Sequence, residues 1–533
     1  MFILKTLIKN NLFLIIIVLT FFIVKLSSIS FLPLFNDEMD VGNQTFSLSN
    51  NLRDYRGNFL PTYLDSFSES RAPLLMYLSI PFVKFLGLNP ISVRLPSIIF
   101  ACLSLIYFYL LVSKLTTKSI GLFSTFILST SIAFFHYSGL AFETSLLILL
   151  IISTTYYFYL KKYFLSLFLF SLTFYTYNIA NIFVPLLVIF LFVSNYQSID
   201  KRKFFLSSLL PIILCLPLLF QIVTGSASNR FSLISIFNQN QKDSIEIKRS
   251  SATNPYSIPE KIFHNRFQST FNTFLNNYIS SFSGDFIFLK GDPNPRHSVP
   301  SFGLFLAPLF LIIPFCFFSK NASNKLFIFW LIISPIAASL TQNGGNHLTR
   351  LFPLIIPLSF FFGCALDFIF LKFKIIFIVF CLFFIYSCFS FYHEYQTHYL
   401  TNQYQSWGYG YQQLFSNLPN HQRLFVSNLN YDLVTPFVFY QKHSNQILND
   451  QSTENIFQDF SGFKINSTYF ITNWKGNTLD QIKNFAQPND LFILKQLKDI
   501  PGDMDLANFD GFKLINQIKD PHQTLLYQVI LKE

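Results

Sequence analysis

Three carboxylates gather within four positions, directly after the first long apolar stretch of the chain. They are Asp37, Glu38 and Asp40 in the segment "FNDEMD" (35–40). A carboxylate at such an interface can accept the proton of a hydroxyl group and turn that hydroxyl into a nucleophile. Acidic residues beside an apolar stretch are more often solvated groups without a further role. The acidic group therefore indicates chemistry only if other groups join it.

Basic residues in other polar segments complement these carboxylates. Arg71 precedes the apolar run "APLLMYLSIPF". Guanidinium and imidazolium groups can bind a phosphate and stabilise the negative charge that grows on it as it leaves. Each alone also fits an ordinary role, because arginines near a membrane extend to the headgroups. The further candidates are Arg296 and His297 in "GDPNPRHS" (291–298), and His347 and Arg350 in "NHLTR" (346–350).

Glu143 is informative because of its position. It ends the run "HYSGLAFE" (136–143), at the mouth of an apolar block. An unpaired charge deep in a membrane costs a few kcal/mol. Glu143 therefore either lies just outside the hydrocarbon, in water, or acts as an acid in a substrate site.

The chain is too apolar for a water-soluble protein of its size. Of its 533 residues 51% are hydrophobic, 71 are Phe and only 12% are charged. The apolar residues form blocks of roughly 17 to 25, the length at which a helix crosses a membrane. We expect a polytopic α-helical membrane protein with about eleven transmembrane helices. The expected spans lie near 11–33, 91–113, 119–135, 142–160, 163–178, 180–194, 204–224, 299–319, 324–341, 351–371 and 375–392.

The short turns between these blocks predict an orientation. If the amino terminus with Lys5 and Lys9 is cytoplasmic, every other short cytoplasmic turn is also basic, as the positive-inside rule requires. We therefore expect a multi-pass protein of the cell membrane with a retained amino-terminal anchor. The other basic turns contain Lys114 and Lys118, Lys161 and Lys162, Lys201 and Lys203, Lys320 and Lys325, and Lys372 and Lys374.

The long polar segments then face outward and define the domains. We expect a membrane module over residues 1–395, with outer loops 34–72 and 225–298, and an extracytoplasmic α/β domain over 396–533. In this last part "QRLFVSNL" and "NSTYFITNW" are typical of short strands.

Charge and cysteine use exclude other classes. The net charge is +11, but the basic residues are scattered between apolar blocks, which suits a lipid bilayer and not a nucleic acid. All six cysteines fall inside apolar blocks, so neither a disulfide framework nor a CxxC metal site is indicated. Outward carboxylates combined with outward Arg and His groups are what transfer of a sugar from a lipid phosphate requires.

Five segments, in order along residues 1–395, resemble membrane glycosyltransferases of the GT-C fold. The branch is that of dolichyl-phosphate-mannose protein mannosyltransferases and lipid A aminoarabinose transferases. The resemblance implies an inverting hexosyl- or pentosyltransferase that uses a polyprenyl-phosphate sugar donor and a protein, lipid or glycan acceptor. The segments run from "NDEMD" to "RLPS" (36–97), then "FHYSGLAFE" (135–143), "FHNRF" (263–267), 276–303 and "SLTQNGGNHLTRLFPLIIPL" (339–358).

The resemblance also implies roles for individual residues. Asp37 is the expected catalytic base, with Glu38 beside it to orient the acceptor or tune Asp37. Glu143 matches an acidic residue of the substrate site. The expected donor-phosphate ligands are Arg71, His347, Arg350, Arg296 and His297.

One position departs from the family pattern. Relatives usually carry an Arg where this chain has Gly139. Three explanations stay open: Arg71 and Arg296 supply the missing charge, donor recognition differs, or activity is weakened.

We expect no cofactor and no metal. Asp37, Glu38 and Asp40 could hold a divalent cation together with Asp292, because oxygen ligands suit Mg²⁺ or Mn²⁺, but no metal-ligand spacing indicates one.

Two other classes of function compete with transfer. A transporter or flippase of a lipid-linked glycan would place ionisable groups near the midplane and show paired repeats. Asp367 instead lies towards the inner end of its span, and no repeat is evident. A catalytically silent scaffold is the third reading, which Gly139 keeps open. Covalent product, lipid movement without product, or no donor binding would distinguish the three.

Overall fold

The computed structural model separates into two compact units. The first consists of residues 1–29 and 94–396, and the second of residues 30–93 and 397–533. Lys5, Lys9, Lys320 and part of the loop 225–298 lie outside the described residues. The structure describes residues 11–65, 70–224, 234–237, 239–319, 321, 324–428, 433–442, 455–456, 460–502 and 504–533.

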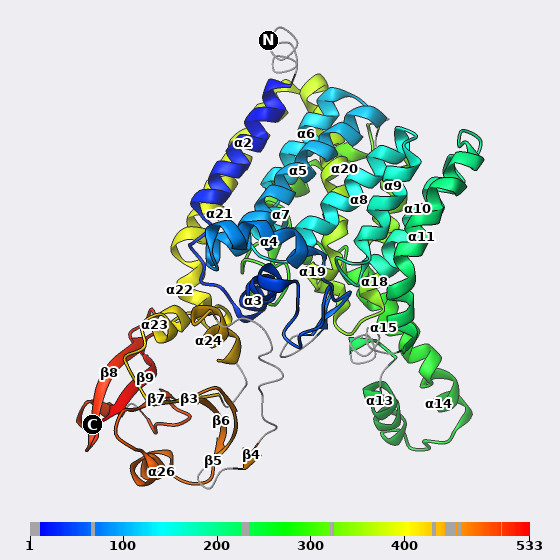
Figure 1. Ribbon diagram of the computed structural model, residues 1–533. Coiled ribbons are helices and arrows are strands. Elements are labelled where there is room, and N and C mark those ends of the chain that lie inside the picture. The colour runs from blue at the N-terminus through cyan, green and yellow to red at the C-terminus, as the bar shows by residue number, and fades with distance from the viewer. Residues whose placement is uncertain are drawn as a thin grey trace. The chain divides into compact units, whose positions relative to one another are not determined.

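Helices make up the first unit (Figure 1). Many of its helices are apolar along most of their length, as expected for segments surrounded by lipid and by each other. They are α2 (Leu12–Ser27), α5 (Pro90–Leu115), α6 (Lys118–Thr130), α7 (Ile132–Ser138), α8 (Thr144–Tyr159), α9 (Tyr163–Thr173), α10 (Ala180–Ser194), α11 (Lys201–Thr224), α17 (Lys325–Ile333), α18 (Ile336–Ser339), α20 (Ile355–Lys372) and α21 (Lys374–Thr397).

Further helical segments connect these helices and carry much of the polar chemistry. They are α13 (Gln239–Ser250), α14 (Ile258–Phe263), α15 (Arg266–Ser280), the π-helical turn η1 (Asp285–Leu289), η2 (Ala307–Ile312), α16 (Ile313–Cys316), η4 (Gly344–Asn346), α19 (Leu348–Leu351) and η5 (Phe352–Leu354).

The apolar helices confirm a multi-pass membrane protein. Among the described residues, Pro90–Leu115, Leu348–Lys372 and Lys374–Thr397 are each long and apolar enough to cross a membrane alone. Helices α6 and α7 would make a fourth span if the bent pair crosses as one. Further apolar helices in the described part of the chain have 10 to 17 residues. The count of about eleven spans therefore stays a prediction.

A sharp bend separates α6 from α7. Their axes meet at 63°, and Ser131 between them has an extended backbone. The Ser131 hydroxyl donates to the carbonyl of Leu304 at 2.9 Å, so the break is tied to another part of the unit. Helix α6 also packs closely on α20, because a Cβ at Gly363 would lie 2.6 Å from the backbone nitrogen of Ser124. Small residues allow such close approach of membrane helices.

The second unit begins with the polar segment after the first apolar helix. The expected outer loop 34–72 contains a helix, α3 (Asn36–Asn51), and a hairpin of β1 (Leu64–Asp65) and β2 (Ser70–Arg71). Helix α4 (Leu74–Leu86), which was not among the expected spans, follows and packs on α3. The contacts thus group residues 30–93 with the C-terminal part of the chain.

A mixed sheet of seven strands forms the rest of the second unit. Its strand order is β4-β5-β6-β3-β7-β9-β8, with β3 parallel to both neighbours and the other pairs antiparallel. The strands are β3 (Arg423–Ser427), β4 (Asn455–Ile456), β5 (Phe460–Ile465), β6 (Thr468–Trp474), β7 (Asp490–Lys495), β8 (Phe512–Lys519) and β9 (Leu525–Lys532). The helical segments are α22 (Tyr399–Gln403), η6 (Tyr404–Ser406), α23 (Tyr411–Phe415), α24 (Val434–Tyr440), α26 (Thr478–Phe485) and η7 (Leu506–Asn508).

Both faces of this sheet are buried, which explains its near-continuous apolar strands. Leu424 and Val426 belong to one apolar cluster, and the alternate residue Phe425 belongs to the other. The Phe425 ring stacks on Tyr469 and Phe492 of the neighbouring strands, with centroids 4.9 and 4.8 Å away. Alternating side chains of a strand point to opposite faces. The two strands expected from the sequence are confirmed as β3 and β6.

Candidate functional site

The acidic cluster is defined as Asp37, Glu38 and Asp40, which lie at the start of α3, together with Arg71 of β2. Asp37 and Glu38 lie in the first turn of the helix, where backbone N–H groups and the helix dipole favour negative charge. Arg71 Nη2 donates to Asp37 Oδ1 at 2.8 Å, and Arg71 Nε lies 3.0 Å from Asp40 Oδ2. One guanidinium therefore bridges two carboxylates from successive turns.

The three carboxylates differ in access to solvent. The side chain of Asp37 is 35% exposed, whereas Glu38 is fully buried and Asp40 is almost so. A proton acceptor must reach its substrate, so Asp37 is the only one of the three placed for that role. Glu38 and Asp40 are buried and therefore suited to a structural role, and Asp40 pairs with Arg71.

Packing within the second unit supports the helix that carries this cluster. Asn43 donates from Nδ2 to the carbonyl of Thr435 on α24 at 3.1 Å. A Cβ at Gly42 would lie 2.7 Å from the Phe439 ring, so the two helices approach closely here. Burial, together with the charge of Asp40, raises the pKa of the Tyr55 hydroxyl well above its ordinary value. The Tyr55 hydroxyl is therefore uncharged at neutral pH.

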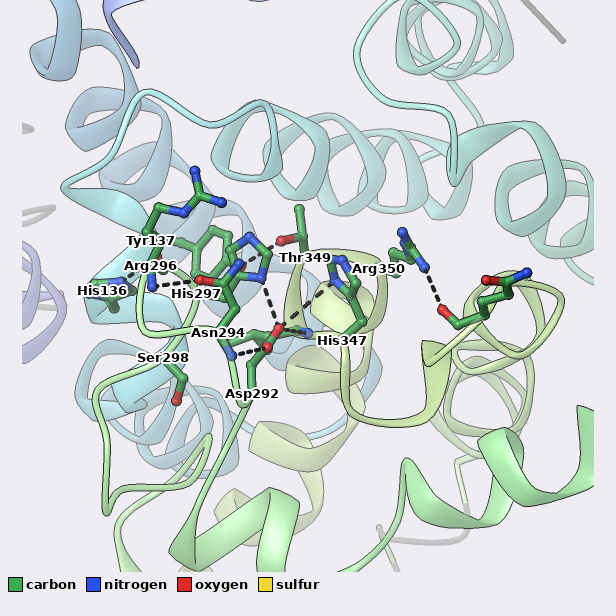
Figure 2. A network of polar contacts seen from close by, with 12 residues as sticks. His136, Tyr137, Asp292, Asn294, Arg296, His297, Ser298, His347, Thr349 and Arg350 are labelled. Carbon is green, nitrogen blue, oxygen red and sulfur yellow. Dashed lines mark hydrogen bonds and ion pairs between the residues drawn. The ribbon is translucent and has the colours of Figure 1, made fainter. Parts of the chain in front are cut away.

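A second group of polar side chains, the Asp292 cluster, joins two loops of the first unit (Figure 2). It consists of the side chains of Asp292, His297 and His347 together with the backbone N–H groups of Asn294 and Leu348. Asp292 accepts three hydrogen bonds: from the Asn294 N–H at 2.8 Å, from His297 Nδ1 at 3.0 Å and from the Leu348 N–H at 2.7 Å. Since Leu348 begins α19, the carboxylate also caps this helix across 56 positions of sequence.

The surroundings of Asp292 and His347 determine their charge at neutral pH. Burial raises the pKa of Asp292, but the hydrogen bond and charge of His297 outweigh it and leave the pKa below its ordinary value. Burial and the neighbouring charge of Arg350 lower the pKa of His347 to about 3. At neutral pH His347 is therefore an uncharged imidazole, and its Nδ1 lies 3.9 Å from Asp292 Oδ2.

The remaining basic candidates lie around this cluster. Arg350 Nη1 donates to the Thr341 hydroxyl at 2.7 Å and to the Gln342 carbonyl at 3.2 Å, which holds the turn before α19. The backbone carbonyl of Arg296 accepts a hydrogen bond from His136 Nε2 at 2.9 Å. In Figure 2 the Arg296 guanidinium points away from Asp292. Arg296, His297, His347 and Arg350 are thus brought together on two neighbouring loops.

Glu143 lies at the start of α8 and is buried, with 6% exposure. It does not cap the helix with its side chain. A hydrated carboxylate outside the protein surface is therefore excluded for this conformation. The role of Glu143 as an acid in a substrate site stays a prediction.

The structure adds a cation that the sequence analysis missed. Lys25, the only charged residue of α2, is 1% exposed, and its Nζ occupies the space where a side chain at Gly139 would begin. A lone lysine in the last turn of an apolar span was the available signal. Lys25 adds a further source for the charge that Gly139 lacks.

Three groups of the Asp292 cluster could hold a metal ion. The ligand atoms of Asp292, His297 and His347 lie within 4.8 Å of one another, which suits Zn²⁺ or a similar ion. However, the three N–H donors already satisfy both oxygens of Asp292. A metal bound through Asp292 would have to compete with these hydrogen bonds. The sequence also offered carboxylate oxygens, including those of Asp40, as ligands of a divalent cation. In the structure Asp40 pairs with Arg71.

The lowered pKa of His347 predicts a pH dependence of stability. The unfolded chain takes up a proton below about pH 6.5, whereas the folded protein does so only near pH 3. Stability is therefore complete above pH 6.5 and lost as the pH falls towards 3. We expect roughly 2 kcal/mol of loss at pH 5. Thermal unfolding at pH 7.5 and 5.0 measures it.

His347→Gln should flatten this dependence, because the titrating group is gone. His522→Gln removes an exposed histidine and serves as the control. An unchanged slope in His347→Gln would assign the acid sensitivity to other groups.

Comparison with known proteins places the fold. Residues 70–220, less than half of the chain, match the model of a family described as dolichyl-phosphate-mannose-protein mannosyltransferase. No curated protein sequence matches the chain.

A solved structure with low sequence identity shares the architecture. The crystal structure of ArnT from Cupriavidus metallidurans bound to undecaprenyl phosphate covers 98% of both chains, with a TM-score of 0.55 and 11% identity. AglB from Archaeoglobus fulgidus, in complex with an inhibitory peptide and a dolichol-phosphate, covers 82% of this chain and 65% of its own, with a TM-score of 0.45 and 12% identity. The similarity to ArnT confirms the GT-C type of fold expected from the sequence motifs.

Proposed function

We propose that this chain is a glycosyltransferase that moves one monosaccharide from a polyprenyl-phosphate donor to an acceptor hydroxyl. The observation that carries the proposal is the acidic cluster, in which one accessible carboxylate, Asp37, is held by Arg71 beside the buried Glu38. The family-model match and the ArnT fold support the same reaction class. A donor with an isoprenoid tail also fits an enzyme built from membrane helices.

Asp37 acts as the base in this mechanism. Its partly exposed carboxylate accepts the proton of the acceptor hydroxyl while the hydroxyl oxygen forms a bond to the anomeric carbon. The bond from that carbon to the phosphate oxygen breaks, and its electron pair leaves with the polyprenyl phosphate. A single displacement inverts the anomeric configuration. Arg71 fixes the carboxylate in place, and Glu38 supports the start of α3.

Basic and polar groups receive the leaving phosphate. We assign this role to Arg71, Arg296 and Arg350 as cations, which stabilise developing charge best where water is excluded. His297 contributes its outer ring nitrogen, because Nδ1 is engaged with Asp292. His347 acts as a neutral group, since its pKa lies near 3. Glu143 serves as an acid in the substrate site.

The proposal includes a direction across the membrane. The basic short turns favour a cytoplasmic amino terminus and an extracytoplasmic C-terminal domain. The acceptor is then a protein, lipid or glycan on the outer face. Protease added to sealed right-side-out vesicles should cleave a C-terminal tag, and protection of that tag would reverse the orientation.

Reconstitution with labelled donor tests the function. Liposomes that contain the purified protein receive polyprenyl-phosphate sugars with a radiolabelled sugar, together with membrane extract as acceptor. We expect label to appear in a covalent product with inverted linkage and free polyprenyl phosphate to accumulate. Label that crosses the bilayer unchanged would instead indicate a flippase. Donor that neither binds nor reacts would indicate a silent scaffold.

We expect transfer to need no metal. Asp292 is satisfied by three N–H donors without an ion, and the proposed base and phosphate ligands need none. Pre-treatment with EDTA and with 1,10-phenanthroline should change the rate less than twofold, an expectation that rests on the reaction class. Loss of activity that Zn²⁺ restores, with metal content that disappears in His347→Gln, would contradict this.

A further inference from the structure

Lys25 is a buried lysine with an unusual environment. Its Nζ lies 3.9 Å from the centroid of the Phe135 ring and 5.5 Å from that of Tyr395. Among the described residues no carboxylate pairs with this ammonium and no acceptor receives a hydrogen bond from it. Its three N–H donors therefore have only aromatic faces as neighbours.

This arrangement is costly unless an anion joins it. A desolvated cation–π contact stabilises by about 2 kcal/mol, whereas burying an uncompensated ion costs several kcal/mol. Lysines near helix ends usually avoid this cost by extending to the headgroups. Lys25 does not, because it is 1% exposed and its side chain runs inward to Gly139.

Gly139 leaves the space that the ammonium occupies. A Cβ at this position would lie 2.5 Å from Lys25 Nζ and 2.8 Å from Cε. The backbone of Gly139 has φ −95° and ψ 7°, a conformation that any residue can adopt. Backbone geometry therefore does not call for glycine here. Glycine is needed at position 139 for a steric reason: a larger residue would collide with the Lys25 side chain.

A second buried cation lies close by. Arg94 is 1% exposed and donates from Nη1 to the carbonyl of Ile29 at 2.7 Å. It is near enough for its charge to repel that of Lys25, and both charges act on His136. Two like charges thus share a low-dielectric region at the end of the first apolar helix.

We propose that Lys25 and Arg94 bind the phosphate of the lipid-linked donor, with Gly139 as the residue that admits the Lys25 ammonium. This inference rests on the proposed function, and it names a donor ligand from the first apolar helix. A phosphate carries the negative charge to compensate the Lys25 ammonium and the oxygens to accept its unused N–H groups. The cation absent at position 139 is then supplied by another helix.

Affinity for a lipid phosphate tests the assignment. The full chain is placed in phosphatidylcholine nanodiscs, and binding of labelled undecaprenyl phosphate is measured. We expect Lys25→Met to weaken binding at least tenfold. Lys162→Met, which removes an exposed lysine at another helix end, should leave affinity unchanged.

Stability without ligand separates binding from a structural role. If Lys25 serves a ligand, Lys25→Met removes an uncompensated buried charge and should raise the unfolding temperature of the ligand-free protein. The further rise that undecaprenyl phosphate causes in the wild type should shrink. A fall in ligand-free stability with unchanged affinity would assign Lys25 to packing and overturn the proposal.

Substitutions at position 139 provide a test on a second element. Gly139→Ala should weaken binding in the wild type, because its methyl group displaces Nζ, but have little effect in Lys25→Met. The double variant Lys25→Ala with Gly139→Arg returns a cation to the same space and should recover most of the affinity. Independent, additive effects of the two positions would contradict the shared site.

Three outcomes distinguish this inference from its premise. Wild-type affinity in Lys25→Met overturns the role of Lys25 alone. Absence of undecaprenyl phosphate binding in the wild type overturns both the inference and the proposed donor class. Full competition by millimolar inorganic phosphate would assign the site to free phosphate, against a lipid headgroup.

Discussion

Asp37→Asn should abolish sugar transfer while the protein folds normally. The amide cannot accept the acceptor proton, and general bases contribute about 10²- to 10⁴-fold to rate. We expect at least a hundredfold loss of turnover with labelled polyprenyl-phosphate sugar in proteoliposomes. Arg71 keeps Asp40 as a partner, so its charge stays compensated. Donor binding should change far less than turnover.

Two further variants set the limits of this prediction. Asp37→Glu keeps a carboxylate but shifts it by one methylene, so it should recover part of the activity at most. Asp40→Asn retains the accessible Asp37 and removes a buried partner of Arg71, so it should act mainly on stability. Transfer at wild-type rates by Asp37→Asn would remove Asp37 from the mechanism.

Asp292→Ala should both destabilise the first unit and stop transfer. The substitution leaves the Asn294 and Leu348 N–H groups and His297 Nδ1 without their acceptor. Each unsatisfied buried donor costs about 1–3 kcal/mol. We therefore expect a loss of roughly 3 kcal/mol or more in unfolding free energy. Transfer should fall because the loops that carry His297 and Arg350 are no longer joined.

A neighbouring carboxylate provides the matched control. Asp285 also pairs with a basic residue, Lys290 at 2.7 Å, but both side chains are more than half exposed. Asp285→Ala should cost at most about 1 kcal/mol, as exposed ion pairs do. Hydrogen exchange at residues 292–298 and 347–350 should rise in Asp292→Ala only. Equal effects of the two variants would show that the Asp292 cluster does not hold the loops.

Local patterns predicted the elements well where one physical constraint dominates. Apolar blocks indicated membrane helices because no water in the bilayer can satisfy exposed backbone groups. The short apolar and aromatic runs of the C-terminal part indicated β3 and β6 because both faces of that sheet are buried. The polar segment 34–72 was harder, since α3 is buried by the second unit and carries no apolar stripe of its own.

The sequence by itself determined the class of protein, the order of its motifs and the residue types available for chemistry, because these follow from composition and local spacing. Only the tertiary structure decided which of these residues contact one another. Arg71 bridges Asp37 and Asp40, Asp292 caps a helix 56 positions away, and Lys25 fills the space beside Gly139. Such pairings depend on how distant segments pack, and local hydrophobicity and propensity carry no record of them.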